Sequence, residues 1–184
     1  MILFGKNINL RLVDKSDAEF IVSVRSASHR TKHLSKIEAS LNSQIKWIDE
    51  YKERENLGTE YYFVIEGKQG KRYGLVRVYD FRQDSFCWGS WIIIDGSPAH
   101  VAIESALIIY EFGFYRLGFK RVHFDVQKGN DKVVAFHLRL GSVIVDEDEK
   151  QYFFNYDITD YEKIKPRYSR YLPDNNEVSD GKSV

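Results

Sequence analysis

The 184-residue sequence predicts an α/β fold, a mixed and strongly twisted sheet of about seven strands with about four helices. Segments with a two-residue hydrophobic period alternate along the chain with segments of helical period. The expected element order is β-α-α-β-β-β-α-β-α-β-β. A strand, a helix and a strand between residues 86 and 127 form a βαβ crossover, so at least these two strands should be parallel. We expect one domain over residues 1–172 and a disordered tail over 173–184.

The N-terminal part predicts one strand followed by two helices. Apolar and polar residues alternate over 7–13, which is typical of a strand. Ser16 and Glu19 form a capping-box pattern, which predicts a helix from Asp17 to about Ala27. Apolar residues at helical spacing predict a second helix, from residue 42 or 43 to about residue 55.

The middle of the chain predicts an antiparallel meander of three strands, over 61–66, 72–81 and 86–94, because turn-forming residues separate three β-rich runs. A helix over 98–117 follows, since Pro98 suits a first helical turn and the apolar residues after it keep a 3.6-residue period.

The last elements are a strand, a short helix and a hairpin. The strand covers 121–127, where apolar residues occupy alternate positions. The short helix begins near Val133 and ends near Gly141. The hairpin pairs 143–145 with 152–156 across an acidic turn.

Composition argues against several classes of protein. The chain carries 27 basic and 27 acidic residues, so it lacks the positive excess of an electrostatic nucleic-acid binder or of a protein that binds anionic membranes. Its apolar runs are too short to cross a bilayer, and its first residues lack the features of a signal peptide, so a cytoplasmic location is expected. The single cysteine, Cys87, permits no internal disulfide and no cysteine-rich zinc site. We expect no metal.

The start of the helix after residue 97 is a candidate anion site. A helix N-terminus presents unpaired N–H groups and a partial positive charge, which suit a phosphate or a pyrophosphate. Ser97, Ala99 and Ala102 are small enough to let such a group approach. The alternative is an ordinary helix start capped by Ser97.

Two segments resemble the GNAT superfamily of acyl-CoA-dependent N-acetyltransferases. NDKVVAFHLRLGS, Asn130 to Ser142, is similar to the family's Asn-x-x-small-x-x-x-Tyr-x-Lys/Arg-x-Gly-Phe motif, with His137 at the tyrosine and Ser142 at the phenylalanine. GSWIIIDG, residues 89–96, resembles the bulged strand before the family's pyrophosphate loop. The resemblance covers about residues 7–156 and agrees with the element order.

The pyrophosphate loop departs from the family pattern. The signature Gln/Arg-x-x-Gly-x-Gly/Ala falls on Pro98, Val101 and Ile103, so all three signature residues are missing. Val101 puts a branched side chain where the family has glycine, and His100 is a candidate compensating donor. The alternative for His100 is an exposed helix residue.

The resemblance implies acetyl-CoA as co-substrate. Its pantetheine arm would enter between the strands 86–94 and 121–127 and pair with strand backbone. The implied cofactor-binding residues are Ile92, Ile93, Ile94, Ser97, Ala99, His100, Val101, Ala102, Asn130 and Phe136.

The implied reaction is the attack of a neutral amine on a thioester, which needs a base and a proton donor. His137 is the implied donor, since an imidazolium near pH 7 is a competent acid. Asp125, on the polar face of its strand, is the leading base, ahead of Glu66, Asp80 and Glu104. The alternatives are a space-filling histidine and a solvated carboxylate. Cys87 is expected to be a core residue.

The acceptor pocket implied by the resemblance combines aromatic and cationic residues. These are Arg25, His29, Arg30, Tyr62, Tyr79 and Trp88, with His33 and Phe81 beside them. Such a pocket suits a small amine, and we expect an amino sugar, free or nucleotide-linked. The alternatives are a protein N-terminal acetyltransferase and a non-catalytic binding module. Most of these aromatics could equally be core. A homodimer is left open.

Overall fold

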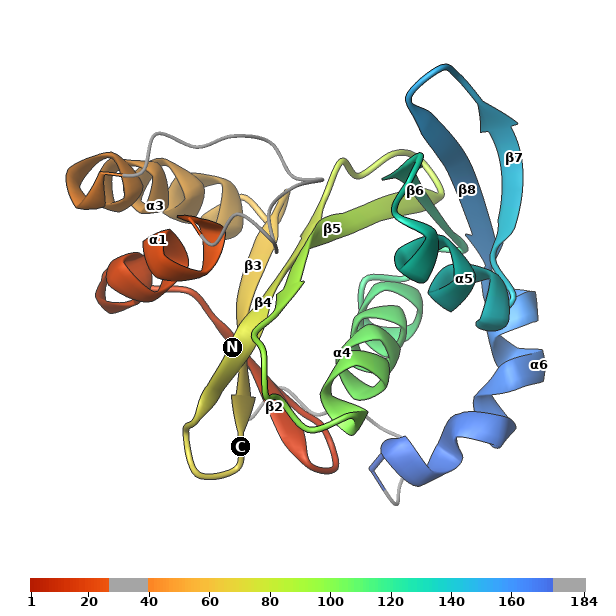
Figure 1. Ribbon diagram of the computed structural model, residues 1–184, viewed down its shortest axis with the longest axis horizontal. Helices are drawn as coiled ribbons and strands as arrows, with labels where there is room; N and C mark the ends of the chain where they lie inside the picture. Colours follow the sequence, from red (N-terminus) through yellow and green to blue (C-terminus); the bar gives the residue numbers. More distant parts are fainter. Residues whose placement is uncertain (27–39, 174–184) are drawn as a thin grey trace.

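The computed structural model describes residues 1–26 and 40–173 and contains one eight-stranded sheet with the strand order β1-β2-β3-β4-β5-β6-β8-β7 (Figure 1). The strands are β1 (Ile2–Phe4), β2 (Ile8–Leu12), β3 (Tyr61–Gly67), β4 (Arg72–Tyr79), β5 (Ser85–Ile93), β6 (Arg121–Gln127), β7 (Val143–Glu147) and β8 (Gln151–Asp157). The helices are α1 (Ala18–Ser26), α3 (Leu41–Asn56), α4 (His100–Glu111), α5 (Asp131–Arg139) and α6 (Ile158–Tyr168). Short turns of helix are η1 (Lys15–Asp17), η2 (Phe112–Arg116) and η3 (Ser169–Tyr171).

The α/β class and the mixed sheet are confirmed, and the described residues add one strand and one helix to the expected number. The extra strand is β1, whose three residues are too short to show a period and which pairs antiparallel with β2. The extra helix is α6, where Pro166 weakens the helical signal in the sequence. The long helix expected over 98–117 ends earlier, because α4 passes into the π-helical turn η2 at Phe112.

The cap before α1 lies two residues earlier than the sequence pattern predicts. Asp14 is the N-cap of η1, and its carboxylate accepts a hydrogen bond from the Ser16 N–H at 2.8 Å. The Asp17 carboxylate accepts in return from the Asp14 N–H at 2.9 Å. Asp14 and Asp17 therefore form the capping box that the sequence analysis placed on Ser16 and Glu19.

Helices cover the two faces of the sheet over different strands. Figure 1 shows α1 and α3 beside β3 and β4, while α4 lies on the other face and α5 lies beside β6. Val24, Ile48 and Tyr51 pack beneath α1 and α3 in one hydrophobic cluster. A larger cluster that includes Tyr110 and Phe154 lies around α4. The other face of β6 is polar. His123 and Asp125 lie on that face, and along the strand they alternate with residues that point into the core.

The strands β5 and β6 are parallel and part after two residue pairs. Ser85 pairs with Arg121 and Phe86 with Val122, and no further pair joins the two strands. All seven residues of β6 instead pair antiparallel with β8. A gap between two strand edges therefore opens from Cys87 onward.

A bulge in β5 shapes the same region. Arg77 pairs with Gly89 and Leu75 with Ile92, so β5 has one more residue than β4 between these pairs. Ser90 lies within that stretch with a φ of 47°, a left-handed conformation that is uncommon outside glycine. A bulge leaves one residue unpaired and bends its strand. The structure thus bears out the bulged strand that the sequence suggested for residues 89–96.

The N-terminal hairpin is tied to α4 by a buried carboxylate. Glu104 is fully buried and accepts hydrogen bonds from the N–H groups of Asn7 at 2.6 Å and Ile8 at 3.0 Å. It also accepts from the Asn7 side chain at 2.9 Å. Glu104 is thus a structural residue rather than the weaker base candidate that the sequence allowed.

We predict that Glu104→Ala lowers the free energy of unfolding by about 3 kcal/mol, because it leaves buried N–H donors without an acceptor. The measurement is urea denaturation followed by circular dichroism. Glu149→Ala, in the exposed turn between β7 and β8, should change stability by less than about 0.5 kcal/mol. Equal effects of the two substitutions would contradict the assignment.

Candidate active site

Aromatic side chains line the α4 side of the gap and surround His137 of α5. The His137 ring lies 4.3 Å from the Phe124 ring and 5.4 Å from the Trp88 ring, measured between centroids. Phe136 packs against Trp91 at 4.9 Å, and the indole N–H of Trp91 donates to the Ser105 hydroxyl at 3.1 Å. These residues come from β5, β6 and α5, so they close one side of the opening between the strands.

His137 is a neutral imidazole at physiological pH. Its side chain is buried, and its Nδ1 atom has no hydrogen-bond partner among the described residues. Burial lowers the pKa of His137 to about 3, because an apolar surrounding disfavours the charged ring. The expectation of an imidazolium acid near pH 7 is therefore wrong in the free protein. A neutral ring still carries one N–H donor.

Ser97 does not cap α4, which was the alternative that the sequence analysis allowed for this turn. The Ser97 hydroxyl donates to the carbonyl of Ile94 at 2.7 Å and so closes the turn after β5. Ala99 is the N-cap residue, and no side chain caps the helix. The first-turn N–H groups of α4 thus lack a side-chain acceptor, and all but that of Val101 can bind a ligand.

Val101 does not stand in the path of a ligand at α4. Its side chain is fully buried in the hydrophobic cluster around α4, and its N–H donates to the Pro98 carbonyl at 3.0 Å. The expected obstruction by a branched side chain at the glycine position is wrong, because the helix turns this side chain into the core. Its side chain and its N–H therefore both point to a structural role for Val101. His100 is half-buried in the first turn of α4.

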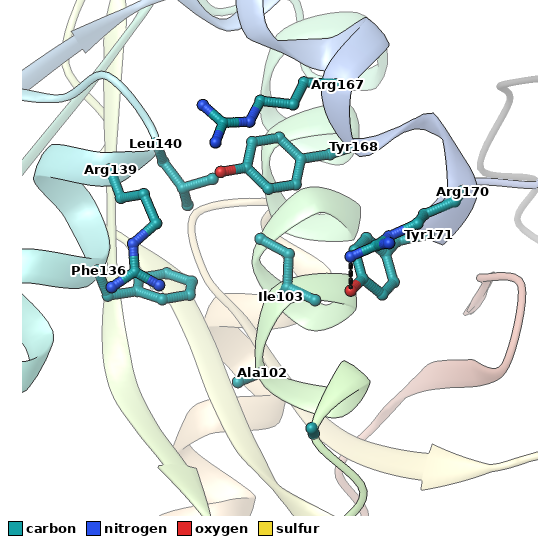
Figure 2. Close-up of a pocket in the computed structure, with 10 residues that line it drawn as sticks. Ala102, Ile103, Phe136, Arg139, Leu140, Arg167, Tyr168, Arg170 and Tyr171 are labelled. Atoms are coloured by element: carbon teal, nitrogen blue, oxygen red, sulfur yellow. Dashed lines mark hydrogen bonds between the residues drawn. The ribbon is translucent and has the colours of Figure 1, made fainter.

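A pocket of about 570 Å³ lies where α4, α5, α6 and η3 meet (Figure 2). Three predicted cofactor-binding residues, Ala99, Ala102 and Phe136, line it. The sequence analysis missed the other residues that line it, and they are Ile103, Arg139, Leu140, Arg167, Tyr168, Arg170 and Tyr171. Arg139 was visible in the motif, whereas the residues of α6 and η3 lie beyond the stretch that resembles the family.

The backbone of β5 presents one residue of the Ile92–Ile94 segment to the gap. The Ile94 N–H donates to the Tyr73 carbonyl of β4 at 2.8 Å. Because neighbouring residues of a strand direct their backbone groups to opposite edges, Ile93 directs its N–H and C=O away from β4 and toward the gap. Asn130 lies across the gap at the start of α5, and its side chain makes no capping hydrogen bond.

The opposite face of the gap carries Tyr79, Cys87 and Asp125. Tyr79 pairs with Cys87 across β4 and β5. Burial raises the pKa of both groups, and the negative charge of Asp125 adds a smaller contribution. Burial is the main cause that raises the pKa of Cys87 to about 12, so its thiol stays protonated and is a core group. Burial also raises the pKa of Asp125, with a smaller contribution from Asp148. A carboxylate with a raised pKa is a better proton acceptor.

A histidine that the sequence analysis did not single out lies on this same face. His123 Nδ1 is 2.9 Å from the Ser85 hydroxyl, and Nε2 is 3.0 Å from the Asp80 carboxylate. Asp80 has a φ of 49°, and its hydrogen bonds with His123 and Arg82 lower its pKa. The alternation of side chains along β6 is enough to predict that His123 and Asp125 share a face. The contact of Asp80 with His123 depends on the turn after β4.

The predicted acceptor residues fall into three groups. Tyr79 lies on the face just described. Trp88 is 4% exposed and packs against Tyr110 on the α4 side, because its register partner is Val78 rather than Tyr79. The Trp88 assignment to the acceptor pocket is therefore wrong.

Tyr62 is buried beneath α3, against the rings of Trp47 and Tyr51. Burial raises the pKa of Tyr62, and the nearby positive charge of Arg25 offsets part of this rise. His29, Arg30 and the neighbouring His33 lie outside the described residues. Phe81 packs against Tyr61 and Phe119, away from Tyr79.

Trp47 and Arg77 are further residues that the sequence analysis missed. The Arg77 guanidinium lies over the Tyr79 ring at 4.6 Å and over the Trp47 ring at 5.5 Å. It also forms an ion pair with Glu60 at 2.6 Å. The helical spacing of Trp47 and Tyr51 in α3 was the available signal. Together with Tyr79 they make an aromatic and cationic surface beside the gap.

Residues 7–143 match the profile of the acetyltransferase (GNAT) domain. The chain belongs to the GNAT superfamily. It is an acetyl-CoA-dependent N-acetyltransferase. No curated protein matches the chain.

Solved structures agree with this membership. Apo FdhC, described as a nucleotide-linked sugar GNAT, has a TM-score of 0.87 and 42% sequence identity, and the match covers 94% of this chain and 99% of that chain. A ribosomal-protein-S5-alanine acetyltransferase from Vibrio fischeri has a TM-score of 0.75 at 15% identity, covering 88% and 98%. A spermidine N-acetyltransferase from Vibrio cholerae, solved with CoA and spermine, has a TM-score of 0.71 at 19% identity, covering 85% and 98%. The last two similarities show the fold alone.

Over 1–26 and 40–173, no three histidine, cysteine or acidic side chains are grouped to hold a metal ion. Within the same ranges, none of the helices has the length and hydropathy needed to span a membrane.

We predict that His137 makes the protein less stable in acid. Its pKa is about 3 in the folded chain and about 6.5 in an unfolded one, so between these values the unfolded chain binds the proton more readily. Stability should fall as the pH drops below 6.5, by up to about 1.4 kcal/mol per pH unit from this group.

The measurement is urea denaturation at pH 7 and pH 5 for the protein and for His137→Phe, which should lose this component. The His137 ring resonances give an independent reading by NMR. A titration of that ring with a midpoint near 6 would overturn the assignment.

Proposed function

We propose that the enzyme transfers an acetyl group from acetyl-CoA to the primary amine of a nucleotide-linked amino sugar. The observation that carries the proposal is the 42% identity to FdhC, over 94% of this chain, because FdhC is described as a nucleotide-linked sugar GNAT. The aromatic and cationic surface of Trp47, Arg77 and Tyr79 supports it, since such a surface suits a sugar ring and an anionic carrier.

The pantetheine arm of acetyl-CoA would occupy the gap between β5 and β6. The backbone groups of Ile93 that are turned toward the gap can pair with its amides as a further strand would. The diphosphate would bind the first turn of α4 at Ala99, His100 and Ala102, where the helix dipole favours an anion. Asn130 would contact the arm from the other side of the gap.

The thioester carbonyl would lie at the bulge of β5. The bulged stretch near Ser90 lacks the regular pairing with β4, so it offers N–H groups to the oxygen that becomes negative in the tetrahedral intermediate. Preorganised backbone donors of this kind stabilise the transition state without having to reorient.

The amine would attack from the face that carries Asp125. Its nitrogen lone pair forms the new C–N bond as the thioester C=O becomes an oxyanion, and Asp125 accepts a proton from the nitrogen. The intermediate then collapses and the C–S bond breaks, so that CoA leaves as a thiolate. The His137 N–H donates a hydrogen bond to this sulfur, and the thiolate then takes a proton from solvent. The Asp80–His123 pair lies on the same face, beside the path of the incoming amine.

Acceptor selectivity is the first test. Thiol release from acetyl-CoA should be at least about 100-fold more efficient in kcat/KM with a nucleotide-linked amino sugar than with spermidine or an alanine-initiated peptide. Hydrogen bonds to sugar hydroxyls and charge complementarity to the carrier phosphates are the physical reasons. A preference for the peptide would instead support the alternative of a protein N-terminal acetyltransferase.

The base is tested by Asp125→Asn, which keeps the shape of the side chain and removes its proton affinity. We expect kcat to fall about 100-fold, with the KM for acetyl-CoA nearly unchanged. Glu147→Gln, the same exchange on the exposed strand β7, is the matched control and should keep full activity. An unchanged kcat in Asp125→Asn would remove Asp125 from the mechanism.

A further inference from the structure

Arginines from three separate elements surround the pocket at the start of α4. Arg139 ends α5, Arg167 is in the last turn of α6, and Arg170 is in η3. Figure 2 shows them on different sides of the pocket, with Ile103 of α4 between them. None of the described residues that line the pocket carries a carboxylate.

These arginines differ from the others that the structure describes in detail. Arg11, Arg54, Arg77 and Arg121 each form an ion pair with a carboxylate at 2.6 to 2.9 Å. Within residues 1–26 and 40–173, by contrast, no carboxylate pairs with Arg139, Arg167 or Arg170. Three guanidinium groups that no described carboxylate neutralises thus surround one hollow, in a chain of zero net charge.

The floor of the pocket adds to this positive potential. Ala99 and Ala102 place the first turn of α4 at the pocket, and that turn contains no acidic residue. The small side chains leave the N–H groups and the positive end of the helix dipole open to an anion. Anything that fills the pocket therefore meets positive charge from the helix end and from the arginines.

Aromatic rings complete the lining and hold two of the arginines. The Arg170 guanidinium donates to the Tyr171 hydroxyl at 2.8 Å and lies 4.7 Å from the centre of that ring. The Arg167 guanidinium lies 5.9 Å from the centre of the Tyr168 ring. Guanidinium groups held in this way lose less freedom when they bind a phosphate, and ring faces nearby suit a purine base.

We propose that α6 and η3 form a binding site for the 3′-phosphorylated adenosine diphosphate end of CoA, in which Arg167 and Arg170 select the 3′-phosphate. The inference rests on the proposed function, because it requires that the rest of acetyl-CoA occupies the gap. Phe136 supports it, since this residue lines the pocket and adjoins His137 at the gap. Arg139 and the first turn of α4 are then left for the diphosphate.

The other source of such an anion is the nucleotide of the acceptor. The pocket lies on the α4 and α5 side of the sheet, whereas Tyr79 and Asp125 lie on the opposite face. A nucleotide in the pocket would thus be on the side of the donor rather than of the amine. This placement favours CoA.

The experiment is calorimetric titration of the full chain with adenosine 3′,5′-bisphosphate, ADP and uridine diphosphate. The bisphosphate should bind at least 10-fold more tightly than either diphosphate. The double variant Arg167→Gln/Arg170→Gln should reduce this preference to less than 3-fold, and the matching double lysine variant should keep part of it. Lys163→Gln removes one charge from the outer side of α6 and should leave the preference unchanged.

Two outcomes would overturn the proposal. One is that the double glutamine variant keeps the full preference for the bisphosphate. The other is that uridine diphosphate binds more tightly than the bisphosphate and loses affinity in the same variant, which would assign the pocket to the acceptor.

Because the titrations need no turnover, the two proposals can fail separately. Acetyl transfer to no amine, with the nucleotide preference intact, refutes the proposed function alone. Transfer with equal kcat/KM for acetyl-CoA and acetyl-3′-dephospho-CoA refutes the arginine assignment alone.

Discussion

The parting of β5 from β6 is the constraint on which the rest of the site depends. The two strands share two residue pairs, and beyond Phe86 and Val122 each has a different set of contacts. The other edge of β6 forms backbone hydrogen bonds with β8, and the other edge of β5 forms them with β4. The gap therefore leaves two facing strand edges with unused hydrogen-bonding groups. An exposed edge of this kind is a ready site for a further extended segment.

The two sides of the gap differ in chemistry, and in the proposed mechanism each side serves a different substrate. On the α4 side, Trp88, Phe124 and Phe136 exclude water and keep His137 neutral. On the other side, Asp125 and the Asp80–His123 pair are carboxylate-rich and more open. In the proposed mechanism the amine would approach from the second side, and the thioester would lie on the first. The sheet would then separate the donor from the acceptor, and the two would meet only in the gap.

Periodicity predicted most of the fold, because the residues of a half-buried strand alternate between apolar and polar along the sequence. The strand over 121–127 was predicted with its true bounds, since its apolar residues alternate without interruption. Side-chain placement near the bulge was harder to predict. Tyr79 and Trp88 were assigned to one pocket, but Tyr79 pairs with Cys87, so Trp88 lies on the opposite face. A register one residue different would have exchanged these faces, and nothing local in the sequence fixes it.

Contacts between segments far apart in the chain could not be predicted, for the same reason. Val101 looked like an obstacle at a glycine position, yet only the packing of α4 shows that its side chain belongs to the core. Likewise Asp80 and His123 are 43 residues apart, and a left-handed residue at the end of β4 brings them together. Motif matching located the segments to which we assign the cofactor. It could not tell which atoms of those segments are free.

The substitution of histidine for the family's tyrosine changes the donor without demanding a charged ring. A buried phenol is neutral because its pKa lies far above 7, and the buried imidazole of His137 is neutral because its pKa lies far below 7. Both therefore offer one neutral hydrogen-bond donor to a leaving thiolate at physiological pH. An imidazolium would place an uncompensated positive charge among aromatic rings before the negative sulfur had formed. Such a buried charge is unfavourable. The aromatic rings around His137 thus favour hydrogen bonding over proton donation, and in the proposed mechanism the amine proton would be removed on the opposite side of the gap.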